Sequence, residues 1–461
     1  MYLSVIRFKF VQFVFPMEKV NIFWFRRDLR VDDNHGLYEA LNAGLPVLAI
    51  FIFDTAILKR FYHPNDARLT FIHRCLTELN REFEKHGSCL QVYFSSPEVV
   101  FNQLAAKYSI QCIYTNTDYE PSAIERDTLV EKQLALMGIG FQAFKDQVVF
   151  HHNEVVKADG SPYAVFTPYS KKWKAQLAIK GIAMYESEKL LNRLKPLPKG
   201  YFPELSEIGY QPQDIQFPEK DFDLSIIENY AHTRDFPAEN GTSRLGIHLR
   251  FGTISIRKLT LFAQQHSEVY LNELIWRNFY MDILWHFPHS ANNSFKTTYD
   301  FIPWRNNESE FDCWCNGQTG YPLVDAGMRQ LNQTGYMHNR VRMVVASFLT
   351  KHLLIDWRLG EAYFADQLLD YELASNTGGW QWASGSGCDA APYFRVFNPI
   401  LQAKKFDHDS QYIHQWVPEY GTASYPQPIV DHVFARNRAI ETYSKALHTI
   451  SLPIKKILFL L

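Results

Sequence analysis

The sequence predicts a protein of two unlike halves, an N-terminal α/β domain built on a doubly wound parallel sheet and a larger C-terminal domain that is all helical. Short apolar runs, rich in β-branched and aromatic residues, alternate with helical patterns over the first 150 residues. After residue 221 the helical period dominates and strand-like runs are absent. The 461 residues suffice for two large domains. We expect the α/β domain at 18–150, an interdomain connector at 151–217 and the helical domain at 218–450.

Four stretches are candidates for the strands. VNIFWF begins at Val20, PVLAIFIF at Pro46, CLQVYF at Cys89 and IQCIYTN at Ile110. Between the second and the third, residues 66–86 carry apolar side chains at helical spacing. Strands that alternate with helices in this way form parallel sheets. No G-x-G-x-x-G follows the first strand, which argues against an ordinary nicotinamide-binding domain.

The N-terminus and the connector carry weaker patterns. Residues 1–17 lack the small-residue cleavage site of a signal peptide, and Met17 begins a more natural start. We therefore interpret this segment as a disordered or spurious extension. Prolines accumulate between residues 196 and 218, as expected of a long connection on the surface. Inside the connector, VFTPYSKKWK begins at Val165.

Composition limits the possible functions. The net charge is -2, so any contact with nucleic acid must come from a local patch. Aromatic residues reach 15%, which is a large supply of stacking surface for a flat ligand. The six cysteines show neither paired nor metal-binding spacing, so we expect reduced thiols in a cytoplasmic protein and no bound metal. No stretch is apolar for long enough to span a membrane.

The stretch from Asp370 to Asp407, DYELASNTGGWQWASGSGCDAAPYFRVFNPILQAKKFD, is unusual for either a core or a loop. Trp380 and Trp382 follow Gly378 and Gly379, and small residues come next. Glycine lets the chain approach a bound group closely, and tryptophan offers a wide apolar face. The pattern favours a site for a flat ligand. The alternative is a glycine-rich turn with two packed aromatic rings.

The segment NGTSRLG, residues 240–246, places Thr242 and Ser243 ahead of an apolar run. This pattern predicts a helix N-cap. The free N–H groups and the dipole of a helix start can bind an anion such as a phosphate. A plain cap is the alternative.

The segment YLNELIWRNFYMDIL predicts a helix with an unusual face. Glu273, Trp276, Arg277 and Tyr280 fall at i, i+3, i+4 and i+7, so a carboxylate, an indole and a cation share one side. A charge in an apolar stripe is costly unless it is paired, and this favours a lined cavity over plain core packing. Burial would raise the pKa of Glu273 toward neutral pH.

These motifs, together with TGYMHNRVRM at 334–343, resemble those of the photolyase and cryptochrome family, most closely the bacterial class I cyclobutane pyrimidine dimer photolyases. The resemblance runs from about Val20 to Trp416. It implies that the helical domain binds FAD. The residues that it implies for FAD binding are Tyr230, Thr242, Ser243, Arg244, Leu245, Gly246, Tyr270, Arg277, Arg342, Asp370, Tyr371, Glu372 and Asn376.

The sequence departs from the family at four of its motif positions, one of which is Thr377, where many relatives have a second asparagine. Many relatives have serine at the position of Gly246, tryptophan at Tyr270 and glutamate at Asn278. Asn376 matches an asparagine that faces flavin N5 in photolyases, where plant cryptochromes tend to have an acid.

The resemblance also implies a lesion pocket, an electron path and a DNA surface. The residues matching the catalytic pocket are Glu273, Trp276, Asn339, Met343 and Trp382. The tryptophans matching those that pass an electron to the flavin are Trp304, Trp357 and Trp380. The residues matching DNA contacts are Arg234, Glu273, Trp276, Arg277, Tyr280, Asn339, Arg340, Trp382 and Arg395.

The function implied is light-dependent repair of cyclobutane pyrimidine dimers in UV-damaged DNA, in which photoexcited reduced FAD gives an electron to a dimer that has been flipped out. Photolyases are among the enzymes known to extrude their target base. The (6-4) photolyases have histidines at the positions of Asn339 and Met343, so their absence here favours cyclobutane dimers.

Other functions within the family stay open. One is a cryptochrome-type blue-light photoreceptor, for which we would expect a long C-terminal extension, whereas about 45 residues follow Trp416. Another is a photolyase of (6-4) or single-strand specificity. A second, antenna chromophore, either folate or deazaflavin, is possible in this family, and the sequence around Tyr119 and Glu120 resembles one edge of such a site. We assign no antenna residue, and we expect a monomer.

Overall fold

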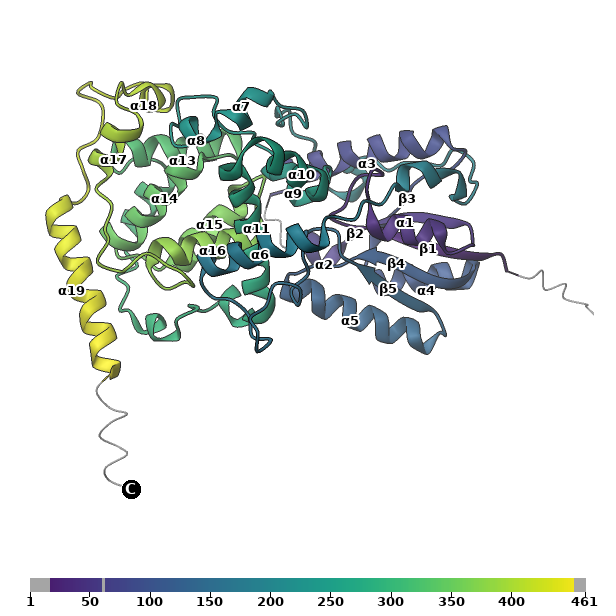
Figure 1. The fold of residues 1–461 in the computed structure, drawn as a ribbon. Helices are drawn as coiled ribbons and strands as arrows, with labels where there is room; N and C mark the ends of the chain where they lie inside the picture. The colour runs from purple at the N-terminus through teal and green to yellow at the C-terminus, as the bar shows by residue number, and fades with distance from the viewer. Residues whose placement is uncertain (1–16, 60–62, 452–461) are drawn as a thin grey trace, which may run out of the picture.

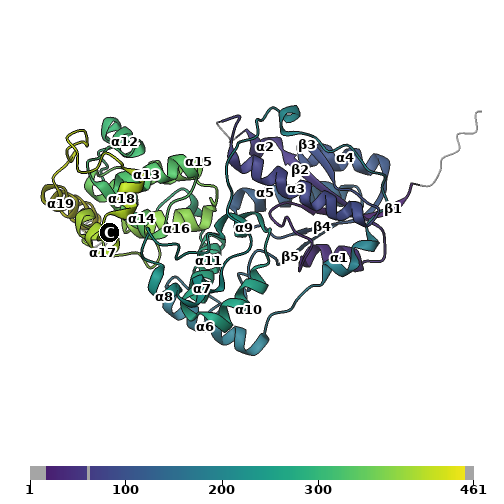
Figure 2. The ribbon, with the colours of Figure 1, turned by 90° about the horizontal axis from the view of Figure 1, so that it is seen from above.

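The computed structural model describes residues 17–59 and 63–451 and has two lobes, one containing a sheet and the other only helices (Figure 1). The extension expected at 1–17 lies outside the described residues except for Met17. Figure 2 shows the two lobes side by side, with α9 and α11 at the boundary between them. The predicted combination of an α/β half and an all-helical half is confirmed.

The sheet lobe contains five parallel strands in the order β3-β2-β1-β4-β5. Because the order reverses at β1, helices can cover both faces. The strands are β1 (Lys19–Phe25), β2 (Val47–Asp54), β3 (Gln91–Ser95), β4 (Ser109–Asn116) and β5 (Gly140–Phe144). The helices between them are α1 (His35–Asn42), α2 (Thr55–Leu58), α3 (Ala67–Lys85), α4 (Pro97–Lys107) and α5 (Pro121–Leu136).

Alternate side chains of the central strands build two separate cores. Phe23 and Phe25 of β1 pack with residues of α1 and α3, whereas Ile22 and Trp24 pack with residues of α4 and α5. This is the period of two that a strand buried on both faces requires. The doubly wound sheet that the sequence predicts is therefore present.

The edge strand β5 was not predicted. Its sequence, GFQAF, has no continuous apolar run, and only Phe141 and Phe144 are half-buried while the other three residues are exposed. A strand at the edge of a sheet has one free side and needs less apolar surface. Its pattern is therefore too weak to separate it from a loop.

The segment predicted as a connector serves both lobes. Helix α6 (Phe166–Lys180) buries Tyr169, Trp173 and Leu177 against α11 in the helical lobe. Further along, Leu191 and Leu194 belong to the core of the sheet lobe. After β5 the chain thus contributes α6 to the helical lobe and then packs again on the sheet lobe at Leu191 and Leu194. The rest of the helical lobe follows this segment.

The helical lobe has no strand among its described residues. Its α-helices are α7 (Leu224–Glu228), α8 (Tyr230–Thr233), α9 (Gly246–Phe251), α10 (Ile256–His266), α11 (Glu268–His286), α12 (Glu308–Cys315), α13 (Pro322–Thr334), α14 (Asn339–Ser347), α15 (Trp357–Gln367), α16 (Leu373–Ser384), α17 (Pro399–Phe406), α18 (Gln411–Trp416) and α19 (His432–Ser451). Shorter turns of 3₁₀ or π type lie at Ser187–Arg193, Leu205–Ile208, Pro288–Ala291, Thr297–Phe301 and Phe348–His352. None of the helices in the described ranges is both long and apolar enough to cross a membrane.

Buried ion pairs join the two lobes at the carboxyl edge of the sheet. Arg257 of α10 lies 2.8 Å from both Asp33 and Asp146, and Arg30 lies 2.8 Å from Asp146. Gly252, with φ of 62°, lies so close to the backbone after β1 that an added Cβ would stand 2.2 Å from a carbonyl oxygen. Only glycine allows this approach, so the lobes are fitted closely at this point.

Asp282 of α11 gives a prediction about pH. Its Oδ2 accepts a hydrogen bond of 2.7 Å from the Tyr169 hydroxyl, and burial raises the pKa of Asp282 to about 8. The unfolded value is about 3.9, so the folded state binds more protons between these values and stability falls as pH rises through that window, by up to about 1.4 kcal/mol per pH unit. Asp282→Asn should remove this dependence.

Between pH 5 and pH 8 the free energy of unfolding of the unmodified protein should fall, and that of Asp282→Asn should not. The difference between the two proteins should therefore change by at least about 1 kcal/mol in favour of the variant. Urea unfolding at several pH values measures the difference. Parallel stability curves for the two proteins would show that the Asp282 carboxyl is ionised when buried.

Candidate functional site

The loop before α9 differs from the predicted helix cap. Helix α9 begins at Gly246, and its N-cap residue makes no side-chain hydrogen bond. Ser243 Oγ lies 2.9 Å from the hydroxyl of Tyr270, and Thr242 Oγ1 lies 3.3 Å from the hydroxyl of Tyr336. The predicted cap is wrong, since both hydroxyls face tyrosines instead. The start of α9 is thus not closed by a side chain, which suits a phosphate group.

The same loop explains one departure from the family. A Cβ added at Gly246 would lie 2.6 Å from Asp370 Oδ2, so a serine at this position would require the carboxylate to move. Leu245 is buried. The exposed Arg244, with φ of 52°, places its guanidinium 5.1 Å above the ring of Tyr336.

Glu273 of α11 is held by an arginine. Its Oε1 lies 2.6 Å from Nη1 of Arg234, which follows α8. Burial raises the pKa of Glu273 and outweighs the lowering effect of Arg234. The carboxyl therefore keeps its proton to higher pH than a glutamate in water, as the sequence predicts.

Trp276 forms a parallel stack with Phe166, the first residue of α6. The ring centroids are 3.6 Å apart and the planes differ by 5°. The backbone N–H of Phe166 donates to Asp389 Oδ2 at 3.0 Å. Tyr280 packs on the backbone of Gly378, where an added Cβ would lie 2.3 Å from its ring. The sequence analysis did not include Phe166 and Asp389 in the site, because both contacts join residues that are far apart in the sequence.

Arg277, on the same predicted face of α11, points elsewhere. It lies 3.3 Å from Glu372, which in turn lies 2.6 Å from Arg27 at the end of β1. Glu372 is buried. The structure therefore places these two predicted cofactor residues in an ion-pair cluster between the lobes, away from Glu273.

Two arginines of α14 have acidic partners. Arg340 Nη2 lies 2.7 Å from Asp235. Arg342 Nη2 lies 2.9 Å from Asp370 Oδ2, and its Nε donates to the carbonyl oxygen of Met337 at 2.7 Å. The resemblance implies both Arg342 and Asp370 for FAD binding, and the structure places them in contact.

Four further predicted residues are at least partly accessible: Asn339 and Arg395 of the DNA set, Met343 of the catalytic pocket and Tyr230 of the FAD set. Asn339 and Arg395 are exposed, and Met343 is half-buried with its Sδ 3.7 Å from Nη1 of Arg340. Tyr230 is half-buried, and its ring lies 5.1 Å from that of Tyr270 at a right angle.

Asn376 of α16 is fixed by a glutamate that the sequence analysis did not single out. Its amide nitrogen donates to Glu361 Oε1 at 2.9 Å. Tyr371 and Thr377 lie 3.5 Å from the same oxygen. Burial raises the pKa of Glu361, although these three hydrogen bonds oppose the rise. Nothing in the local sequence reveals this contact, because Glu361 lies on α15.

The tryptophans around α16 differ in their surroundings. Trp380 and Trp357 are buried, and Trp380 packs against Gly360 so closely that an added Cβ there would lie 2.1 Å from its ring. Trp304 lies at a right angle to Tyr443, 5.9 Å away. Trp357 and Trp380 belong to one hydrophobic core, and Trp304 packs against that core. Their part in electron transfer stays a prediction.

Trp382, two residues beyond Trp380, is half-buried, and its nearest described ring is that of Phe397 at 6.4 Å. Trp276 and Trp382 make no ring contact within the described part of the chain.

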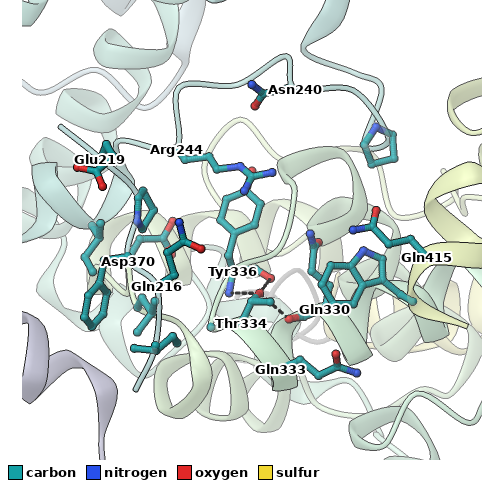
Figure 3. A pocket seen from close by; sticks show the side chains of 18 of the residues that line it. Gln216, Glu219, Asn240, Arg244, Gln330, Gln333, Thr334, Tyr336, Asp370 and Gln415 are labelled. Atoms are coloured by element: carbon teal, nitrogen blue, oxygen red, sulfur yellow. Dashed lines mark hydrogen bonds between the residues drawn. The ribbon is translucent and has the colours of Figure 1, made fainter. Parts of the chain in front are cut away.

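A cavity of about 730 Å³ lies beside the Arg342–Asp370 pair (Figure 3). Arg244 and Asp370 are the members of the predicted cofactor set that line it, with Tyr336 beneath Arg244. Its other walls come from the connector at 214–219, the loop at 237–240 and the end of α13.

The residues present fit FAD. The open start of α9 and the hydroxyls of Thr242 and Ser243 suit its diphosphate. The Arg342–Asp370 pair offers a donor and an acceptor to the polar edge of a ring, and Gly379 leaves open space beside α16.

The edge suggested for an antenna chromophore is occupied by protein contacts. Tyr119 is buried, and Glu120 lies 2.8 Å from Arg27 and 2.5 Å from Arg250. All six cysteines are free.

Both lobes of the chain are similar to known proteins. Residues 21–190 match the family model described as DNA photolyase, and residues 270–423 match that described as the FAD binding domain of DNA photolyase. The chain is 36% identical to the deoxyribodipyrimidine photo-lyase of Synechococcus sp. over 94% of its own length and 98% of that protein.

Two solved structures are similar over nearly the full chain. One is a bacterial class III photolyase from Agrobacterium tumefaciens, with a TM-score of 0.81, 33% identity and coverage of 95% of this chain and 99% of that one. The other is an archaeal photolyase from Sulfolobus tokodaii with two FAD molecules, with a TM-score of 0.75, 34% identity and coverage of 92% and 99%. The chain therefore belongs to the photolyase and cryptochrome family.

Proposed function

We propose that this protein is a deoxyribodipyrimidine photolyase, an FAD enzyme that uses light to split cyclobutane pyrimidine dimers in DNA. The observation that carries the proposal is the likeness to a photo-lyase over 94% of the chain. The helical lobe supports it, because Glu273 and Arg340 are linked there through the adjacent residues Arg234 and Asp235. A carboxyl and a cation are thus held close together beside Trp276.

The residues of the helical lobe then have distinct tasks. When bound, FAD supplies a photoexcited donor that passes an electron to the dimer and takes it back. Arg342 and Asp370 would hold the polar edge of its ring, and Glu361 fixes the amide of Asn376, which would face the same group. Glu273 in its protonated form donates a hydrogen bond to a pyrimidine carbonyl oxygen and stabilises negative charge there.

The DNA surface is a local patch on a chain of net charge -2. Arg234, Arg340 and Arg395 bind backbone phosphates, which gives affinity without sequence preference. Trp276 and Trp382 offer apolar faces to the two flipped pyrimidine rings. A distorted dimer is easier to extrude than paired bases, so it is selected.

We further propose that the enzyme acts as a monomer in the cytoplasm on UV-damaged DNA. A second, light-harvesting chromophore is a further possibility within the family, since the relative from Sulfolobus tokodaii is described with two FAD molecules. The class I assignment and the preference for cyclobutane dimers over (6-4) products are parts of the proposal.

Illumination of the purified protein with UV-irradiated oligothymidylate tests the function. We expect a flavin absorption spectrum, restored thymine under blue light and none in the dark. A matched oligonucleotide containing a (6-4) product should stay unrepaired. A flavin-loaded protein that restores no thymine in light would contradict repair and favour the photoreceptor alternative.

A further inference from the structure

Two consecutive residues after α8 hold charged groups on two different helices. Arg234 pairs with Glu273 of α11 at 2.6 Å, and Asp235 pairs with Arg340 of α14 at 2.7 Å. The turn supplies the basic residue of the first pair and the acidic residue of the second. This single turn of chain therefore contacts both α11 and α14. The groups that it holds, Glu273 and Arg340, are both assigned above to the damaged DNA.

Arg340 is held in place from several sides. Its guanidinium lies 4.3 Å above the ring of Phe406, and its Nη1 lies 3.7 Å from Met343 Sδ. Within the described part of the chain, Asp235 is the acidic residue in ion-pair contact with it. The side chains of Asp235 and Arg340 are 38% and 19% exposed, so another anion can reach the pair.

We propose that Asp235 is a surrogate for a DNA phosphate, a carboxylate that occupies the Arg340 guanidinium in the free protein and is displaced by the DNA backbone in the complex. This proposal rests on the proposed function, because it takes Arg340 as a phosphate contact. Both anions accept hydrogen bonds from the same planar fork of a guanidinium, so they compete for it. Asp235 then lowers the affinity of the protein for DNA in general, damaged or undamaged.

The displacement has a consequence for salt dependence. A phosphate that binds a free arginine releases about 0.9 counterion. Here the released Asp235 carboxylate attracts a cation in turn, so the net release at this contact is smaller. The protein should therefore show a shallower dependence of affinity on salt than its number of phosphate contacts would give.

The experiment compares Asp235→Asn with the unmodified protein by fluorescence anisotropy on dimer-containing and undamaged oligonucleotides at several salt concentrations. We expect tighter binding of dimer-containing DNA by about two- to fivefold at low salt, the range of an exposed ion pair. The slope of log K against log salt should become steeper by up to about 0.9.

Two controls isolate the contact. Glu419→Gln removes the partner of Arg329, a pair of similar distance and exposure at 2.6 Å, 29% and 19%, and should change neither quantity. In an Arg340→Gln background, Asp235→Asn should have no further effect on affinity. Melting temperatures of all variants confirm that they are folded.

Unchanged affinity and slope in a folded Asp235→Asn variant would overturn the proposal, and so would the same gain in the Arg340→Gln background. These outcomes are separate from failure of the proposed function. If the protein repairs dimers but its DNA affinity does not respond to Asp235→Asn, only the proposed role of Asp235 is rejected. If the protein repairs no dimers in light, the proposed photolyase function is rejected.

Discussion

Substituting Glu372 by glutamine should destabilise the protein by about 3–5 kcal/mol, the usual cost of removing one partner of a buried ion pair. Glu372 is buried and lies 2.6 Å from Arg27 and 3.3 Å from Arg277, so it neutralises cations from both lobes. Burial alone would raise the pKa of Glu372, but Arg277, Arg27 and Arg250 outweigh it and lower the pKa. Its contribution to stability is thus present above the unfolded pKa and lost as pH falls through the folded one.

Urea unfolding at neutral pH measures this cost. Glu186→Gln is the matched control, because Glu186 pairs with Lys189 at 2.6 Å on the surface, where both side chains are more than 60% exposed. Its free energy of unfolding should change by no more than about 1 kcal/mol. A loss below about 1 kcal/mol for Glu372→Gln would mean that the lobes do not depend on this cluster.

Replacing Trp382 by alanine should weaken binding of dimer-containing DNA by about 5- to 150-fold, the range that loss of one base-stacking aromatic gives. The ring of Trp382 is half-buried, so part of its surface is free, and we propose that a flipped pyrimidine stacks on it. Undamaged DNA, which has no base in the pocket, should bind about equally well.

Binding curves for the two oligonucleotides test this, and Trp382→Phe should restore most of the affinity because it keeps an aromatic face. Equal losses on damaged and undamaged DNA would remove Trp382 from the lesion pocket. Bound flavin, followed by its absorption, shows whether a loss of affinity comes from a disturbed helical lobe instead.

Much of the fold follows from local pattern. The four predicted strands lie in runs rich in apolar residues, including β3 at the other edge of the sheet, so the sequence alone predicts them. β5 escapes because GFQAF has no such run and is mostly exposed. The helix cap at Thr242 was predicted wrongly. The Thr242 hydroxyl instead lies beside the hydroxyl of Tyr336, which is far away in the sequence.

The site is less predictable, for the same physical reason. Family motifs identify Glu273 and Asn376, but their partners Arg234 and Glu361 are set by how helices pack. The spacing that puts Arg277 on the face of Glu273 says nothing about Glu372, which precedes α16 and lies 3.3 Å from the Arg277 guanidinium. Periodicity predicts neighbours along a helix and cannot predict neighbours across an interface.

The stack of Phe166 on Trp276 also bears on biosynthesis. The backbone of Phe166 is tied to Asp389, 223 residues further along the chain. A ribosome delivers the chain from its N-terminus, so the hydrogen bond that ties Phe166 to Asp389 can form only after most of the polypeptide has emerged. A product cut short by a premature stop before residue 389 would lack the contact that holds Phe166 beside Trp276.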